Sequence, residues 1–98
     1  MSSNVQTLLS FDVGARRTGV AVGNSLSGTA RALGVLDVFD AGPDWSALDG
    51  WMREWSPDAL VVGNPLTEDG ASQPAREKAL RFAKALQARY AKPVGLMD

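Results

Sequence analysis

The residue in this chain best suited to chemistry is an aspartate, Asp12, near the end of an apolar stretch. The run Leu8–Val13 is apolar on both alternating faces, which is typical of a strand covered on both sides in a mixed sheet. Burial of an unpaired carboxylate is costly, so we expect Asp12 to have hydrogen bonds, a positive partner or a metal ion. Gly14 permits a tight turn, and Arg16 and Arg17 add positive charge there. The simpler alternative is a turn acid capped by backbone amides beside a solvated hairpin tip.

The composition of the 98-residue chain narrows this chemistry. Cysteine and histidine are absent, which excludes a thiolate nucleophile, a Cys-based zinc site and a histidine base. Any metal ion would therefore be a hard ion held by carboxylates. An apolar fraction of 45% without a long apolar run predicts one globular domain over residues 1–98 and no membrane association. The polar start Met1–Gln6 does not read as a signal peptide, and the lack of cysteine favours a cytoplasmic location.

Charges are segregated along the chain although the net charge is only −1. The segment Asp37–Asp69 is acidic and contains a single basic residue, Arg53. The segment Arg76–Lys92 is basic and contains a single acid, Glu77. Such segregation can give a near-neutral protein a basic face suited to phosphate groups. An ordinary solvated helix face is the alternative interpretation.

The apolar spacing predicts a mixed α/β fold in the order β-β-β-α-β-α-β. Strands are expected over Leu8–Val13, Thr18–Asn24, Ala30–Phe39, Asp58–Asn64 and Val94–Asp98. One helix is expected from the cap Asp44 to Trp55, and another begins at Ser72 or Gln73 and ends before Pro93. Glycine and alanine leave one face of the second strand nearly bare, so we expect a helix to pack closely there.

A loop follows the strand that ends at Asn64 and runs to Gly70. Loops at the carboxyl ends of sheet strands often carry the sites of α/β proteins. We therefore expect this loop, including Asp69, to lie near the site. A simple turn is the alternative for Asp69 and Gly70.

Three motifs identify a family resemblance. They are FDVGARRTGVAVGN at Phe11–Asn24, GTARAL at Gly28–Leu33 and VVGNPLTEDG at Val61–Gly70, with Gln73 ahead of Phe82. Together they closely resemble the YqgF family, the RuvC-like pre-16S rRNA nucleases, which are also called Holliday junction resolvases. The resemblance spans nearly the whole chain and implies a ribonuclease H-like fold that is incomplete at the C-terminal end.

The resemblance also implies a site. Asp12 matches the first catalytic carboxylate of the family, and Asp98 resembles the first residue of its Asp-Glu-Arg motif. Both are thereby implied as catalytic residues and metal ligands. Family members normally continue with that glutamate and a last helix that carries another aspartate. The loop residues implied near the site are Gly14, Asn64, Asp69 and Gly70, and the candidate nucleic-acid contacts are Arg16, Arg17, Arg31, Arg81 and Lys84.

The implied activity is metal-dependent hydrolysis of phosphodiester bonds. Such sites use two divalent ions roughly 3.5 to 4 Å apart, held by clustered carboxylates, and Mg2+ or Mn2+ suits oxygen ligands. Asp12 and Asp98 alone would bind such ions weakly, so we expect the 98-residue chain itself to be inactive. The favoured role is maturation of the 5′ end of pre-16S rRNA, with branched DNA as the alternative substrate.

Two other functions compete with the nuclease. YqgF-like domains also occur as non-catalytic nucleic-acid-binding modules inside larger RNA-associated proteins. Asp-x-Gly after a strand also resembles the phosphate loop of the actin and sugar-kinase ATPases, but these need two such domains, and the chain is too short. The oligomeric state is not predicted.

Overall fold

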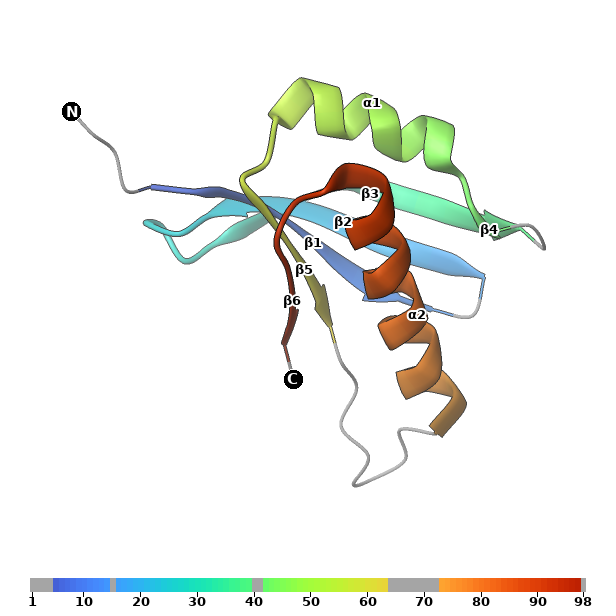
Figure 1. Ribbon diagram of the computed structural model, residues 1–98. Helices are drawn as coiled ribbons and strands as arrows, with labels where there is room; N and C mark the ends of the chain where they lie inside the picture. The colour runs from blue at the N-terminus through green and yellow to red at the C-terminus, as the bar shows by residue number, and fades with distance from the viewer. Residues whose placement is uncertain (1–4, 15, 40–41, 64–72, 98) are drawn as a thin grey trace.

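The elements of the fold are defined by a computed structural model (Figure 1), which describes residues 5–14, 16–39, 42–63 and 73–97, without the side chains of 73–75. The strands are β1 (Thr7–Val13), β2 (Arg17–Asn24), β3 (Ala30–Phe39), β4 (Gly42–Pro43), β5 (Ala59–Gly63) and β6 (Val94–Met97). The helices are α1 (Trp45–Trp55) and α2 (Gln73–Tyr90). The predicted order is confirmed, with β4 as an addition.

The strands form one mixed sheet in the order β4-β3-β2-β1-β5-β6. β1 and β2 are antiparallel, as are β2 and β3, whereas β5 runs parallel to β1 and β6 parallel to β5. β1 is therefore a central strand with one antiparallel and one parallel neighbour. The short strand β4 was not predicted, and its residues Gly42 and Pro43 pair with Phe39 and Val38.

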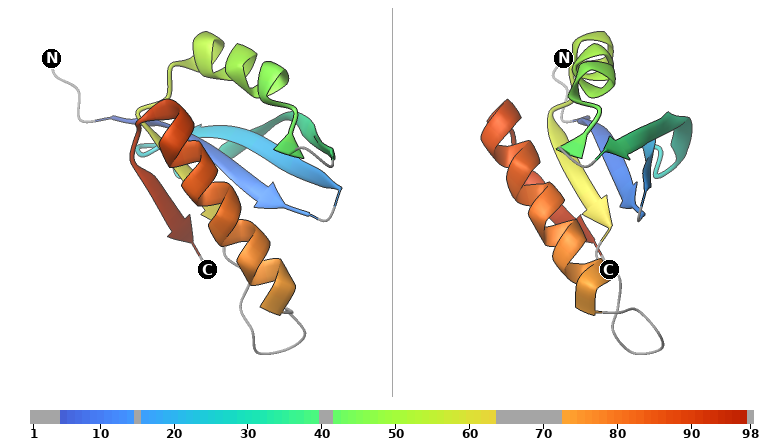
Figure 2. Two further views of the ribbon diagram at one scale, coloured as in Figure 1. Left: turned by 45° about the vertical axis from the view of Figure 1, so that its right-hand side comes forward. Right: turned by 90° about the vertical axis from the view of Figure 1, so that its right-hand side faces the viewer.

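Both helices pack on one face of the sheet (Figure 2). The core combines side chains of this face with side chains from both helices: Leu9, Phe11, Val20, Val22, Leu36, Leu48, Met52, Leu60, Val62, Ala79, Phe82 and Leu86. The two crossovers carry the chain in the same direction across the sheet, from β3 to β5 and from β5 to β6. Right-handed crossovers in one direction place their helices on the same face.

The opposite face of the sheet is not covered by either described helix. It carries Ser10 and Asp12 on β1 and Gly19 and Ala21 on β2, which alternate with the buried residues. Among the described residues, β1 is therefore covered by helices on one face only. The described helices pack on the face where Val20 and its neighbours offer more apolar area, and the expected helix on the glycine and alanine face of β2 stays a prediction.

Helix α1 begins and ends as predicted. The backbone N–H of Ala47 donates to Asp44 Oδ1 at 3.3 Å, so Asp44 is the N-cap. Ser56 adopts a left-handed conformation with φ of 43° and closes the helix by donating its N–H to the Met52 carbonyl. Trp51 packs against β3, where a Cβ added at Gly34 would lie 2.9 Å from its ring.

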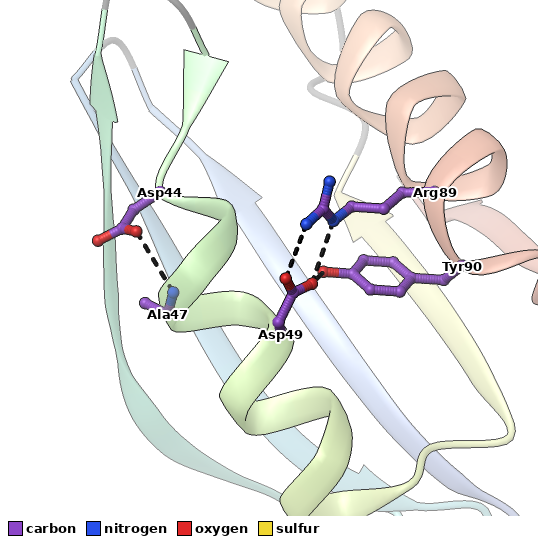
Figure 3. A network of polar contacts seen from close by, with 5 residues as sticks. All are labelled: Asp44, Ala47, Asp49, Arg89 and Tyr90. Carbon is purple, nitrogen blue, oxygen red and sulfur yellow. Dashed lines mark hydrogen bonds and ion pairs between the residues drawn. The ribbon is translucent and has the colours of Figure 1, made fainter.

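An ion pair joins the two helices (Figure 3). Arg89 of α2 donates to both carboxylate oxygens of Asp49 on α1, Nε to Oδ1 at 3.1 Å and Nη2 to Oδ2 at 2.7 Å. The Tyr90 hydroxyl donates to Asp49 Oδ1 at 2.6 Å. The bonds from Arg89 and Tyr90 lower the pKa of Asp49 to about 2. Burial, followed by the bond to Asp49, raises the pKa of Tyr90.

Helix α2 buries one apolar stripe. Ala79, Phe82 and Leu86 are buried, and the ring of Phe82 meets that of Phe11 edge to face at a centroid distance of 5.3 Å. Three of its basic residues, Lys78, Arg81 and Lys84, are exposed. Within the described part of the chain, no helix combines the length and apolar character needed to cross a membrane.

Candidate active site

Asp12 lies near the carboxyl end of the central strand β1, on the face of the sheet opposite the helices. Its neighbours Phe11 and Val13 point toward the core, whereas Asp12 itself is exposed. The prediction of a central strand is confirmed. The expected burial is wrong, because no described helix covers this face of β1. Asp12 therefore needs no compensating partner for folding.

Two glycines leave the surroundings of Asp12 open. Gly19 is paired directly with Asp12 across β1 and β2, and a Cβ added at Gly19 would lie 3.9 Å from the Asp12 Cβ. Gly63 ends β5 on the other side of β1, where an added Cβ would lie 3.5 Å from the Phe11 carbonyl oxygen. Strand alternation puts Gly63 on the same face as Asp12. A ligand as large as a phosphodiester can therefore approach the carboxylate.

The carboxyl ends of three parallel strands meet at this edge of the sheet. Val62 pairs with Phe11 of β1, and Gly63 pairs with Met97, the last described residue of β6. Several predicted site residues lie outside the described residues, namely Asn64, Asp69, Gly70 and Asp98. Their proximity to Asp12 stays a prediction.

The turn between β1 and β2 brings two arginines to the same end of the sheet. The Gly14 N–H donates to the Arg17 carbonyl at 2.8 Å, and a Cβ added at Gly14 would lie 2.7 Å from that oxygen. The predicted tight turn at Gly14 is therefore confirmed. Arg16 and Arg17 are exposed, and alternation puts Arg17 on the face that carries Asp12.

The other predicted nucleic-acid contacts lie elsewhere. Arg81 and Lys84 are exposed on α2, on the helical side of the sheet. Arg31 pairs with Val22, which lies opposite the first half of β1, and its guanidinium sits 5.8 Å from the Trp55 ring centroid. The structure therefore does not bring Arg31 to Asp12.

Among the described residues, Asp12 is the candidate oxygen ligand for a metal ion. A carboxylate such as that of Asp12 is the donor type that Mg2+ or Mn2+ prefers. Among residues 5–14, 16–39, 42–63 and 73–97, no three acidic side chains cluster in a way that could hold a metal ion. The described residues therefore offer the kind of oxygen donor that a divalent ion prefers, but too few of them to hold the ion.

A comparison with known protein families identifies the family of this chain. The family described as "RuvX: Holliday junction resolvase" matches residues 6–98. The chain belongs to the RuvX family. The resemblance inferred from the motifs, YqgF being another name for this family, is confirmed.

The RuvX chain has curated relatives of high identity. It is 58% identical over 92 residues to the "Putative pre-16S rRNA nuclease" of Xanthomonas oryzae pv. oryzae strain PXO99A. This match covers 94% of the chain and 59% of the relative. The protein of the same name from Xanthomonas axonopodis pv. citri strain 306 is 56% identical over the same shares. The RuvX chain thus spans about three fifths of the length of these relatives.

Solved structures confirm the fold of the RuvX chain. Thermus thermophilus RuvC matches with a TM-score of 0.58 and 15% identity, covering 93% of this chain and 63% of RuvC. T. thermophilus RuvC in complex with a Holliday junction substrate matches with a TM-score of 0.61 and 16% identity, covering 93% of this chain and 65% of that structure. Archaeoglobus fulgidus Pelota matches with a TM-score of 0.56 and 11% identity, covering 95% of this chain and 26% of Pelota. The RuvX chain therefore has the predicted ribonuclease H-like fold.

The role of the flanking glycines in the RuvX site was missed from the sequence. Gly19 was interpreted as part of a bare strand face for helix packing, and Gly63 as part of a family motif. The strand register makes both neighbours of Asp12. A glycine paired with the only acid of an antiparallel strand is the signal that, in hindsight, points to an open site.

Proposed function

We propose that the whole protein containing this RuvX chain is a metal-dependent nuclease that hydrolyses phosphodiester bonds in structured RNA. Its role would be to mature the 5′ end of pre-16S rRNA in the cytoplasm. The observation that carries the proposal is the exposed carboxylate of Asp12, at the end of a central strand between Gly19 and Gly63. The names of the curated relatives support the rRNA substrate.

Asp12 is the described ligand of the proposed metal site. Asp98 and a carboxylate from the part of the longer relatives that lies beyond this chain would complete the set. Bound divalent ions activate the attacking water and stabilise the leaving oxygen in such hydrolyses. Residues 1–98 would then form the larger part of one ribonuclease H-like domain.

Arg16 and Arg17 would hold the phosphates of the substrate beside Asp12. They are exposed on the turn that follows β1, and the absence of side chains at Gly19 and Gly63 leaves room for a backbone to cross the strand ends. Phosphate contacts release counterions and do not require the metal. The 98-residue chain is thus expected to bind nucleic acid weakly, in a salt-sensitive way, without cleaving it.

The proposal is tested by comparing this chain with a version extended to the length of its relatives. Structured precursor rRNA and four-way DNA junctions are incubated with each protein in Mg2+ or Mn2+. The extended protein is expected to cleave the RNA and to lose this activity in Asp12→Asn. Inactivity on every substrate with binding intact would favour a non-catalytic module.

Junction resolution is the second candidate, because the family description names a Holliday junction resolvase. The same assay separates the two substrates. Cleavage of the four-way junction in preference to precursor rRNA would favour the resolvase. Cleavage by the 98-residue chain that is lost in Asp12→Asn would instead overturn the inference that its site is incomplete.

A further inference from the structure

A cleft of about 420 Å³ lies between α2 and the sheet. It is lined by residues of β1, β2, β3, β4, α1 and α2, and by Gly14 of the first turn. Its volume falls within the range of roughly 300 to 1,000 Å³ found for small-ligand pockets. The cleft is separate from Asp12, which points to the opposite face of the sheet.

Aromatic rings and two cations give the cleft its chemical character. Phe39, Trp45 and Phe82 line it, and Phe39 is 58% exposed. Lys78 and Arg81, both exposed on α2, are the charged members of the described lining, which contains no acid. An aromatic interior with a cationic rim suits a planar apolar group attached to an anion.

The cleft and Asp12 are on opposite sides of one turn. Val13 and Gly14 line the cleft, whereas Asp12, one residue earlier, faces the other side of the sheet. Arg16 lies in the turn between them, and Arg17 begins β2 on the face that carries Asp12. A nucleic-acid strand that crosses this turn would keep its phosphates beside the arginines while one nucleotide reaches the cleft.

We propose that this cleft binds an unpaired base of a nucleic-acid strand, with its flanking phosphate held by Lys78 and Arg81. The inference deepens the proposed function and rests on it for the class of ligand. A short acidic peptide with an aromatic side chain is the competing occupant. The base is favoured because the cleft adjoins the arginine turn and joins exposed aromatic surface to cations, the combination that binds single strands.

The test is a fluorescence titration of the 98-residue chain in chelator, because Trp45 lines the cleft. Decauridylate RNA is expected to quench tryptophan emission, and an abasic oligomer of equal length and charge is not. Phe39→Ala should weaken decauridylate binding about tenfold, in line with the loss of one base-stacking contact. Leu80→Ala, which removes another partly exposed apolar side chain outside the lining, is the matched control and should bind normally.

Charge variants on α2 add a second arm. Arg81→Gln should weaken decauridylate binding more than Lys84→Gln, because Arg81 lines the cleft and Lys84 does not. Equal binding of the abasic oligomer, or normal binding by Phe39→Ala, would overturn the base pocket and leave the nuclease proposal standing. Phe39-dependent binding of an acidic phenylalanine-containing peptide, without binding of decauridylate, would identify the competing occupant. Base-dependent binding together with an inactive extended protein would instead overturn the nuclease proposal and leave the base pocket standing.

Discussion

Asp12 and Gly19 face each other across β1 and β2, and a Cβ added at Gly19 would lie 3.9 Å from the Asp12 Cβ. This distance is an ordinary van der Waals contact, so a larger side chain at position 19 would fit the sheet. It would also stand directly beside the carboxylate. The open approach to Asp12 therefore depends on a missing side chain and not on the backbone fold.

Gly19→Val is expected to preserve the fold and to block the site. Valine is favoured in strands, so the melting temperature should stay the same or rise. Cleavage by the extended protein should fall by roughly 100-fold, because the valine side chain would displace the substrate from Asp12 and misplaced reacting groups react slowly. The control is Ala21→Val on the same face of β2, paired with Ser10, which should keep its activity. Full activity in Gly19→Val would show that substrate does not pass this strand.

Asp12→Asn should leave stability nearly unchanged. Because Asp12 is exposed, we expect the free energy of unfolding in chelator to change by less than about 0.5 kcal/mol. Denaturant melts of the 98-residue chain measure this, with Asp37→Asn, another exposed strand acid, as the control. A loss above about 1 kcal/mol would indicate a structural capping role for Asp12.

Arg17→Gln should reduce the salt dependence of RNA binding. Each phosphate contact contributes about 0.7 to the slope of log affinity against log salt for single strands, and about 0.9 for duplex DNA. Binding titrations from low to moderate salt should therefore give a slope smaller by roughly that amount. Arg53→Gln, at the exposed end of α1, should leave the slope unchanged. An unchanged slope in Arg17→Gln would remove this residue from the binding surface.

The bond network of Asp49 predicts a loss of stability in acid. The pKa of Asp49 is lowered from 3.8 to about 2, first by the hydrogen bond from Arg89. Its contribution is therefore fully present above about pH 3.8 and is lost as the pH falls toward 2. Melting temperatures from pH 6 to pH 2.5 should fall less steeply in Asp49→Asn than in the wild type. Glu54→Gln on the same helix should keep the wild-type acid profile.

Glycine-to-alanine substitutions at two positions should have opposite effects. At Gly14 an added Cβ would lie 2.7 Å from the Arg17 carbonyl oxygen, so Gly14→Ala should destabilise the fold by about 1 to 3 kcal/mol. At Gly50 in α1 an added Cβ meets nothing within 4 Å, so Gly50→Ala should stabilise it by up to about 1 kcal/mol. Denaturant melts compare the two. Equal effects would show that the turn can relax around Gly14.

Local features of the fold followed from the sequence alone. The bounds of β3, the N-cap Asp44 and the end of α1 at Trp55 were predicted correctly. Periodicity and capping depend on neighbours within a few residues, so they can be read from the chain. The motifs around Asp12 likewise identified the family.

Tertiary structure decided the rest, because it depends on residues far apart in the chain. Both crossovers run in one direction, so the helices share a face and Asp12 is exposed and not buried. Strand register, which periodicity does not specify, paired Asp12 with Gly19. Helix packing brought Arg89 to Asp49, forty positions away along the chain. Such contacts depend on how the sheet and the helices lie relative to one another.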